Sequence, residues 1–534
     1  MLLAQLAAPL MQVAVLLYAL VRRRVSGYGL AIASIAAIGV ALRFYQLGAH
    51  YLSYDESFTV LMTGRSLPDM IRAAAGDVHP PLAYLMYWAF VRVAGVTTPL
   101  TLRLPAAIIG SLSIRQVYGL ARRLDFNRPA LLAGLALFAF SPFEIHYAQD
   151  ARMYGLLQFA VLASILAMLD RRHWLMAFWL AVAMWTHNYG LFYAAVIALA
   201  AFLQEMGRPV VWAPDPLIPQ WTGPEDSARP KQVVIASALA VAAWLPWSLV
   251  VIGQMRALST GYWITPLTLG QAIYPIFPLV WGVALPDSLN GIGAVVAVGL
   301  VLFALLKALK LRRLRLLAWL MLGPALLAAA VSIVATPIYL YRALIGCVAP
   351  MLLLIGWAIT DGTGWRERGW AVAIILPLVL LGNWNRIPTL QAQTSENSWA
   401  LRTVLAGYRP GDVVYHGNVG TLSGFLANGP AWLPNVLMTV QPGSVGVLTP
   451  QTRRALGFCE GDLGPVLITT CGDASWRRAW LVWGASQTIS GTEDRAIADL
   501  LVRYPNVKEL DIHDVYHGPM PVDGGIWLLT NGGQ

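Results

Sequence analysis

Charged residues are scarce in this sequence. Lys, Arg, Asp and Glu together make up 12% of its 534 residues, whereas hydrophobic residues make up 57%. Soluble domains carry roughly 25% charged residues. The scarcity therefore excludes an ordinary soluble protein, and the composition predicts a chain that crosses a membrane several times.

Two other features are rare or missing. The C-terminal part contains no Gly-x-Gly-x-x-Gly sequence and no Walker-type loop, so no nucleotide cofactor is expected. The chain has only three cysteines. Cys347 lies in an apolar run and is most simply a packing residue. Cys459 and Cys471 either form a disulfide in an oxidising compartment or are two free thiols.

Basic residues are unevenly distributed along the chain. Residues 1–390 hold 28 basic and 15 acidic groups, whereas residues 391–534 hold 9 and 12. Clusters of basic residues in short loops mark the cytoplasmic side of a membrane protein. The net charge of +10 is therefore explained without a nucleic-acid partner. These clusters lie at Arg22–Arg24, Arg122–Arg123, Arg171–Arg172, Lys310–Arg315 and Arg366–Arg368.

The apolar runs provide about twelve membrane spans, for each of which roughly 20 residues are needed. They cover residues 2–20, 28–47, 103–121, 129–143, 154–169, 174–188, 190–204, 233–252, 289–307, 316–334, 341–359 and 371–386. The first run is interpreted as a span and not as a cleavable signal peptide, because it lacks a basic start and is followed by arginines. The sequence thus predicts an α-helical polytopic protein of the cell (inner) membrane, in contact with membrane lipids.

Placing the basic clusters in the cytoplasm orients every span. The external connections are then those near residues 48–102, 144–153, 187–189, 253–288 and 335–340. The segment 82–95 is short and rich in aromatic residues, so it is predicted to be an amphipathic helix at the external interface. Residues 205–232 are polar and proline-rich, which is typical of a flexible cytoplasmic connector.

The chain changes character after residue 389, where its net charge reverses in sign. Three apolar stretches there predict strands, and residues 493–504 predict a helix. The strands are expected at residues 411–416, 480–483 and 525–529. The sequence therefore predicts a transmembrane domain of residues 1–389 and a soluble α/β domain of residues 390–534 on the external, periplasmic side.

Two adjacent carboxylates, Asp55 and Glu56, follow the second apolar run. Ionisable groups at a membrane boundary are costly to hold there, so they indicate a functional site. A carboxylate within hydrogen-bond reach accepts the proton of an attacking hydroxyl, which makes this pair a candidate general base with an orienting partner. The alternative is that one carboxylate caps a helix while the other is merely solvated.

Two histidines of the external connections, His79 and His187, are candidate site residues. His79 precedes two prolines that fix an extended turn, and it is a candidate hydrogen-bond donor, metal ligand or simple turn residue. His187 ends another span, where a metal shared with Glu56 or Glu144 is one interpretation. No paired-ligand spacing supports such a metal site, so a divalent metal stays an open question.

Three arginines, Arg103, Arg152 and Arg342, lie at external helix ends, against the inward charge bias. A guanidinium binds phosphate in a bidentate manner and stays charged when partly buried. The set therefore predicts a site for a lipid phosphate. The alternative for each arginine is a side chain that reaches the lipid headgroups, and Arg152 has a second alternative, a structural ion pair with Asp150.

These residues belong to motifs that follow one another in an informative order. An acidic pair after an early span is followed by His79-Pro-Pro-Leu, then by an Arg-Leu-Pro span start at Arg103. A Tyr-Ala-Gln-Asp-Ala-Arg-Met-Tyr stretch then ends at Tyr154, and a later span starts with Tyr341 and an arginine. Together they resemble the GT-C glycosyltransferases, and most nearly the bacterial protein-mannosyltransferase-like and ArnT-like proteins. The resemblance covers roughly residues 28–385.

The resemblance implies a fold and an activity. The fold is a helical GT-C membrane domain with an external α/β domain. The activity is transfer of a sugar from a polyprenyl-phosphate donor to an acceptor hydroxyl of a lipid, glycan or protein, on the external face and usually with inversion. Asp55 matches the catalytic aspartate of the family, and Glu56 matches its supporting acid. Some members use a divalent metal and others none, so the resemblance leaves the metal open.

The same resemblance implies positions that bind substrate. Arg103 matches an arginine of the first external loop region, and Arg152 and Arg342 match positions near the donor phosphate. The full set of expected substrate-binding residues is His79, Arg103, Asp150, Arg152, Tyr154, His187, Tyr341 and Arg342.

Two other functions compete with this one. An oligosaccharyltransferase or glycan ligase of related fold would share the lipid-phosphate site but transfer preassembled glycans. A lipid or polysaccharide transporter would line a passage with acids and arginines. Transporters typically have internal repeats and helices interrupted at the midplane, whereas the polar residues here gather at one face of the predicted bundle.

Overall fold

The computed structural model describes residues 26–206, 228–258, 264–283, 285–416, 419–430, 432–437, 459–460, 467–468, 478–483, 502, 506–510 and 525–530. The chain divides into two compact units. The helical unit comprises Met1–Leu47, Arg103–Val250 and Ile264–Ile387, and the mixed unit comprises Gly48–Leu102, Val251–Trp263 and Pro388–Gln534. The loop of residues 48–102 thus groups with the C-terminal part of the chain, whereas the division expected from the sequence places it in the transmembrane domain.

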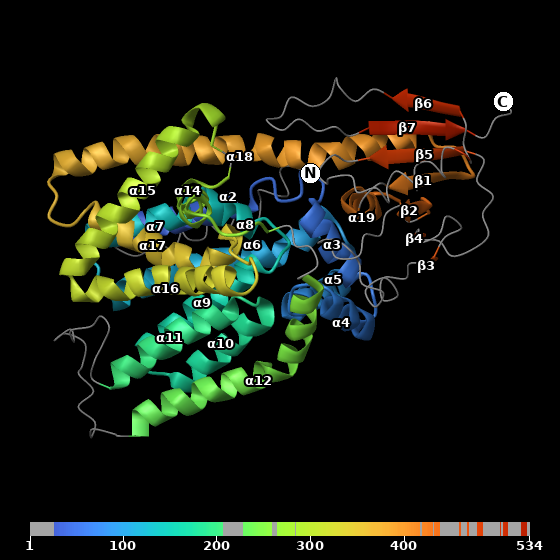
Figure 1. Ribbon diagram of the computed structural model, residues 1–534. Coiled ribbons are helices and arrows are strands. Elements are labelled where there is room, and N and C mark those ends of the chain that lie inside the picture. Colours follow the sequence, from blue (N-terminus) through green and yellow to red (C-terminus); the bar gives the residue numbers. More distant parts are fainter. Residues whose placement is uncertain are drawn as a thin grey trace. The chain divides into compact units, whose positions relative to one another are not determined.

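The described part of the helical unit consists mainly of helices (Figure 1). Those wholly within it are α2 (Gly27–Phe44), α7 (Arg128–Ala139), α8 (Pro142–Ala148), α9 (Tyr154–Leu169), α10 (His173–Thr186), α11 (Gly190–Glu205), α13 (Leu269–Ile273), α14 (Ile276–Trp281), α15 (Asp287–Lys310), α16 (Arg312–Val334), the 3-10 helix η1 (Tyr341–Cys347) and α17 (Val348–Ala358). Three more helices extend past its boundaries: α6 (Pro99–Arg123), α12 (Ala228–Leu258) and α18 (Trp365–Gly407).

Several of these helices can cross a membrane. Among the described residues, five are long and apolar enough, and the bent pair α7–α8 raises the number to six. Helices α9, α10 and α11 coincide with predicted spans, but their 16, 14 and 16 residues fall short of the roughly 20 that a span needs. The predicted span at residues 2–20 lies outside the described residues, as does most of the predicted connector 205–232. The number of twelve spans therefore stays a prediction.

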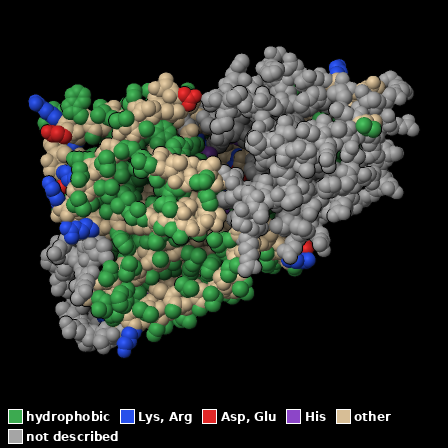
Figure 2. All heavy atoms as spheres, viewed as in Figure 1, with side chains coloured by type: hydrophobic (Ala, Val, Ile, Leu, Met, Phe, Trp, Pro, Cys, Tyr) green, Lys and Arg blue, Asp and Glu red, His purple; other side chains and the backbone are tan. Residues whose placement is uncertain are grey.

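The surface of the helical unit has the character expected of a lipid-facing bundle. Within the coloured part of Figure 2, many hydrophobic side chains lie at the surface, and Lys and Arg side chains lie at the left edge of that view. The exposed apolar side chains include Leu249 of α12, Val295 of α15 and Val334 of α16, with 75%, 74% and 85% of their surface accessible. Contiguous apolar surface of this kind needs an apolar environment, which supports a membrane location.

A largely buried helix begins at the predicted site residues Tyr341 and Arg342. The segment Tyr341–Ala358, formed by η1 and α17, is long and apolar enough to cross a membrane, and 89% of it is buried. Its first turns are 3-10 in form, and Tyr193 of α11 supports them: its hydroxyl donates to the carbonyl oxygen of Ala343 (2.9 Å) and accepts from the N–H of Gly346 (3.1 Å). The start of this helix is therefore fixed by a neighbour. Cys347, at its junction, is buried as expected.

The fourth predicted span is broken. Helices α7 and α8 meet at an angle of 49°, and α8 starts at Pro142, which lacks an N–H and cannot continue the preceding helix. The carbonyls at the end of α7 then need other donors. The fully buried Arg43 of α2 donates to the oxygen of Ala139 at 2.9 Å, and Asn383 of α18 donates to the oxygen of Phe140 at 2.8 Å. These two side chains make the break tolerable inside an apolar bundle.

The mixed unit contains three helices from the first loop and a sheet from the C-terminal part. The helices are α3 (Tyr54–Thr63), α4 (Leu67–Gly76) and α5 (Leu82–Ala94), and α5 is the helix predicted at residues 82–95. The other elements are β1 (Asp412–His416), α19 (Val419–Asn428), β2 (Asn435–Leu437), β3 (Cys459–Glu460), β4 (Leu467–Ile468), β5 (Arg478–Trp483), β6 (Asn506–Leu510) and β7 (Gly525–Thr530).

The seven strands form one mixed sheet with the order β3-β4-β2-β1-β5-β7-β6 (Figure 1). Strand β1 pairs in parallel with β2 and β5, and β7 pairs antiparallel with β5 and β6. The three predicted strands are confirmed as β1, β5 and β7, and Gly411 before β1 has a φ of 95°, which suits the predicted turn. Apart from Val502, the predicted helix at 493–504 lies outside the described residues, as do the side chains of Cys459 and Cys471.

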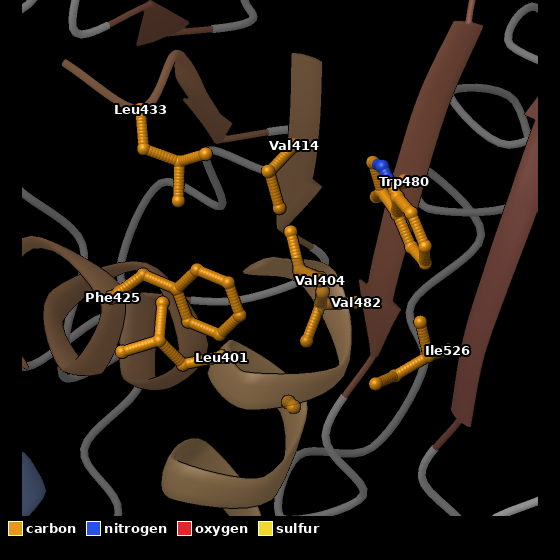
Figure 3. Close-up of a cluster of buried hydrophobic side chains, with 9 residues drawn as sticks. Leu401, Val404, Val414, Phe425, Leu433, Trp480, Val482 and Ile526 are labelled. Carbon is orange, nitrogen blue, oxygen red and sulfur yellow. The ribbon is translucent and has the colours of Figure 1, made fainter. Parts of the chain in front are cut away.

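A hydrophobic core joins this sheet to two helices. In Figure 3, Leu401 and Val404 from the end of α18 and Phe425 from α19 lie against Val414 of β1 and Val482 of β5. All five side chains are at least 98% buried. Burial of each is worth roughly 1.5–3 kcal/mol relative to exposure. The strands therefore fold onto helices from the same part of the chain, which is the layered arrangement expected of an α/β domain; that this domain is separate and external stays a prediction.

Asp412 at the start of β1 should stabilise the sheet in a pH-dependent way. Its carboxylate accepts hydrogen bonds from Arg478 Nε (2.8 Å) and Nη2 (2.6 Å), Trp480 Nε1 (2.9 Å) and the N–H of Arg409 (2.9 Å). Burial alone would raise the pKa of this carboxyl, but the hydrogen bonds from Arg478, Trp480 and Arg409 outweigh burial and hold its pKa below the ordinary 3.8.

A group whose pKa is lower in the folded state stabilises the fold above its unfolded pKa and loses that contribution as the pH falls through its folded pKa. We therefore expect Asp412→Asn to weaken hydrogen-exchange protection of the amides in β1 and β5 by about 1–3 kcal/mol at pH 5–8. The difference from the wild type should shrink below pH 3.8. Equal protection in both proteins at neutral pH would contradict this role.

Candidate functional site

The acidic pair lies in the first turn of α3. Ser53 caps this helix: its Oγ accepts from the N–H of Glu56 at 3.3 Å, and Glu56 Oε2 accepts from the N–H of Ser53 at 3.0 Å. This reciprocal pair is a capping box, and it leaves Glu56 97% buried. Asp55 is half-buried in the same turn, where the positive end of the helix dipole favours a carboxylate. The helix-cap alternative is thus realised by Glu56, whereas the role of Asp55 as a general base stays a prediction.

His79 lies next to another carboxylate of the mixed unit. Its Nδ1 is 3.2 Å from Oδ2 of Asp77, and the hydroxyl of Tyr84 on α5 donates to the same oxygen at 3.0 Å. The ring of Tyr84 lies 6.4 Å from the ring of Phe58 on α3, edge to face. The arrangement links the α3 helix that carries the acidic pair to the turn that carries His79. A carboxylate at Nδ1 orients the imidazole and leaves Nε2 for other partners.

In the helical unit, three segments far apart in sequence meet at Tyr154. The guanidinium carbon of Arg342 lies 5.8 Å from the centre of the Tyr154 ring, and the ring of His187 lies 6.0 Å from it. Tyr154 is the first residue of α9, and the turn just before it carries Asp150 and Arg152. Arg152 is 95% buried, and its N–H donates to the carbonyl oxygen of Asp150 at 2.8 Å. The structure thus groups five of the predicted site residues.

His187 is held in one tautomer. The N–H of Tyr189 donates to its Nδ1 at 3.0 Å, so Nδ1 acts as an acceptor and the ring proton lies on Nε2 in the neutral form. A ring in this state presents an N–H donor, which suits an anionic or hydroxyl-bearing ligand better than it suits a metal ion. Among the residues that the structure describes, no group of three or more His, Cys, Asp and Glu is arranged to hold a metal ion.

Tyr341 belongs to an aromatic cluster beside Arg342. Its ring centre lies 6.4 Å from that of Phe143 on α8 and 6.1 Å from that of Tyr274, which follows α13. Tyr341 and Tyr274 are both accessible to solvent in part, and Tyr274 is 55% exposed. An accessible aromatic surface next to a cation can contact the apolar faces of a bound ligand; the role of Tyr341 in binding stays a prediction.

Arg103 binds a main-chain carbonyl of a distant segment. It is 94% buried near the start of α6, and its Nη1 donates to the carbonyl oxygen of Leu47 at 3.0 Å. A carbon added to Gly155 would lie 3.9 Å from the carbonyl oxygen of Ala106, so α6 approaches the start of α9 one turn after Arg103. Part of its guanidinium therefore anchors the chain after α2, in addition to any role in binding.

Four polar residues of the helical unit were not identified from the sequence: Arg43, Gln149 and Arg386, which are buried, and Asn383, which is half-buried. All four bind main-chain carbonyls or one another. The available signal was the presence of arginines at the ends of apolar runs, because an arginine inside a bundle needs a partner or a function. Most of their acceptors are backbone oxygens, however. Every residue has one, so the sequence does not show which of them will be bound.

Residues 78–215 match the family model of the dolichyl-phosphate-mannose-protein mannosyltransferases. That stretch includes His79, Arg103, Asp150, Arg152 and His187. No curated protein sequence is significantly similar to this chain.

Among solved structures, ArnT from Cupriavidus metallidurans bound to undecaprenyl phosphate is similar over 94% of this chain and 98% of that one, with a TM-score of 0.53 and 12% identity. The chain shares the fold of ArnT. The apo form of ArnT gives a TM-score of 0.51 and 13% identity, over 93% of this chain and 97% of that one. The oligosaccharyltransferase AglB from Archaeoglobus fulgidus has a TM-score of 0.41 and 11% identity, with coverage of 74% and 63%.

The resemblance to GT-C glycosyltransferases that the motifs predict is therefore confirmed. An identity of 12% establishes the common fold with ArnT and leaves the substrate to be inferred from the residues of this chain.

Proposed function

We propose that this protein is a membrane glycosyltransferase that moves a sugar from a polyprenyl-phosphate donor to an acceptor hydroxyl on the external face of the inner membrane. The observation that carries the proposal is the convergence of Arg342 and His187 on Tyr154, which opens α9 two residues after Arg152. Arg152 is almost fully buried, and a guanidinium can bind the oxygens of a phosphate in a bidentate manner and stays charged when buried. The fold supports the proposal, because ArnT has been solved with undecaprenyl phosphate bound.

The donor phosphate is the natural ligand of this group. Guanidinium groups bind phosphate oxygens in a bidentate manner, the Nε2–H of His187 is a further donor, and the N-terminus of α9 adds a favourable dipole. The polyprenyl chain would lie along the apolar helices. No nucleotide loop is required, because the sugar arrives already activated on its lipid.

The proposed reaction is a single displacement with inversion. The oxygen of the acceptor hydroxyl attacks the anomeric carbon and forms the new glycosidic bond while the bond from that carbon to the phosphate oxygen breaks. The phosphate leaves with the electron pair, and arginines that are already in place stabilise its charge. Asp55 accepts the proton of the acceptor hydroxyl. Glu56, which shapes the helix start through its capping box, supports Asp55.

The identity of sugar and acceptor is the first thing to establish. Purified protein would be incubated with radiolabelled undecaprenyl-phosphate sugars, each with a lipid, glycan or peptide acceptor. We expect label to move from one donor to one acceptor class. A multi-sugar glycan moved from its lipid in preference to single sugars would favour an oligosaccharyltransferase or glycan ligase, and no transfer from any polyprenyl donor would contradict the proposal.

We also propose that the part of the chain beyond residue 390 is external. Its net charge is negative, whereas the basic clusters lie in the membrane part. In a variant with Cys459 and Cys471 replaced by Ser, a cysteine at the exposed position Val502 should react with a membrane-impermeant maleimide in intact cells. A matched cysteine at Arg366, in a predicted cytoplasmic cluster, should react only after lysis. The opposite pattern would invert the topology.

A further inference from the structure

The end of α2 depends on one side chain from a distant part of the sequence. The last carbonyls of a helix have no partners within it, and here the Nε2 of Gln149 lies 3.1, 3.0 and 2.8 Å from the carbonyl oxygens of Leu42, Arg43 and Tyr45. The oxygen of Phe44 accepts from the N–H of Leu47 at 3.3 Å. Gln149 therefore donates to this helix end from outside it, with its two amide hydrogens shared among three carbonyl oxygens.

The opposite end of the same amide is also occupied. Nη1 of Arg386, on α18, donates to Oε1 of Gln149. Arg386 is 96% buried and Gln149 is 91% buried. Three carbonyl oxygens on one side and a guanidinium on the other permit only one orientation of the amide, with its NH₂ toward α2 and its oxygen toward α18. Gln149 is thus clamped between two helices that belong to separate regions of the sequence.

This clamp lies directly before the turn that carries the phosphate-binding group. Gln149 follows α8, its N–H donates to the oxygen of His146 at 2.9 Å, and the turn continues through Asp150 and Arg152 to the first residue of α9. A five-residue turn fixed at its first residue by a side chain and at its end by a helix has little freedom. If the side chain of Gln149 is lost, its three carbonyl acceptors become unsatisfied, and the turn is held at one end only.

We infer that Gln149 and Arg386 are positioning residues, which set the place of Arg152 and Asp150 by clamping the turn between α8 and α9. This inference rests on the proposed function for its consequence in binding, but not for its structural part. A buried Gln–Arg pair that merely adds stability would change the melting temperature alone. A clamp also changes the order of the turn and the affinity for an anionic lipid, because misplacement of a binding group by about 1 Å costs up to a hundredfold.

The test compares Gln149→Ala, Gln149→Glu, Arg386→Met and the double variant with Arg386→Met and Gln149→Ala. Gln149→Glu keeps an acceptor for Arg386 but removes the donor to α2, so it separates the two halves of the clamp. The matched control is Gln116→Ala, because Gln116 on α6 also donates its amide to a main-chain carbonyl, that of Phe159 at 3.2 Å, and is remote in sequence from the turn.

Two readouts are taken on the full-length purified protein: hydrogen exchange of the amides of residues 150–153, and affinity for undecaprenyl phosphate as the probe. We expect faster exchange in the turn and about tenfold to hundredfold weaker binding in Gln149→Ala, Gln149→Glu and Arg386→Met, with neither change in the control. The double variant should be no worse than the worse single variant, because the two residues act as one unit.

Unchanged exchange in the turn of Gln149→Ala, or faster exchange with undiminished binding of the probe, would overturn the inference. Faster exchange in a protein whose wild type does not bind undecaprenyl phosphate would support the clamp and overturn the proposed function instead. The two failures are therefore distinguishable in a single set of samples.

Discussion

Replacing Asp55 by Asn is expected to abolish sugar transfer while donor binding stays near the wild-type level. Asp55 is the half-buried member of the acidic pair, in the first turn of α3, whereas the carboxylate of Glu56 is engaged in the capping box. An amide cannot accept the proton of the acceptor hydroxyl, and loss of a general base typically costs 10²–10⁴-fold in rate. The rate of transfer and the affinity for undecaprenyl phosphate would be measured on the same preparation.

Two matched variants make this result interpretable. Asp69→Asn removes an acidic residue from the first turn of α4 in the same unit, where it pairs with Arg72 at 2.8 Å, and it should leave the rate unchanged. Glu56→Gln keeps the capping box, since Gln serves as well as Glu at that position, and it tests the charge of Glu56 without the cap. Turnover at the wild-type level in Asp55→Asn would remove this residue from the mechanism.

The arginines that we propose as ligands of the donor phosphate should show the second large effect. Arg152 and Arg342 replaced by Lys keep the charge but lose the bidentate fork, so donor affinity should fall while the protein stays folded. Replacement by Ala should weaken binding further and also slow transfer by about 10²–10³-fold, because the leaving phosphate loses a donor that stabilises it. Donor affinity, rate and melting temperature would be compared for all variants.

Arg103 is the informative contrast within this series. Because its Nη1 binds the oxygen of Leu47, Arg103→Ala should lower the melting temperature as well as donor affinity. For Arg152, a carboxylate at Asp150 offers a structural alternative to phosphate. Unchanged donor affinity together with a collapsed melting transition for Arg152 and Arg342 would identify both as structural ion-pair partners, and the phosphate site would lie elsewhere.

Much of the helical layout is readable from the sequence because apolar runs and their polar ends are local signals. Helix α9 has the predicted bounds, Tyr154–Leu169, and the strands at β1, β5 and β7 occur where Gly411, Trp480 and Gly525 indicate them. The capping box at Glu56 is also local, since Ser53 lies three residues before it. Each of these elements is decided within a few residues of chain.

The break between α7 and α8 and the clamp at Gln149 are not decided locally. Arg43 reaches a carbonyl 96 residues away, and Arg386 reaches a side chain 237 residues away. Backbone carbonyls exist at every position, so no residue type marks those that will need a donor. The short helices α10 and α11 were predictable as apolar runs. Whether each crosses the membrane or packs within the bundle depends on its neighbours and was not predictable from the sequence.

The central claim is that a polyprenyl phosphate carries the sugar, and the stoichiometry of a single turnover tests it most directly. Purified protein would be given an undecaprenyl-phosphate sugar labelled in both the sugar and the lipid, and the two labels would be followed separately. We predict one undecaprenyl phosphate released for each sugar transferred to acceptor, and no transfer from nucleotide sugars. Transfer from a nucleotide sugar, or movement of the intact labelled lipid across a vesicle membrane without cleavage, would contradict the account.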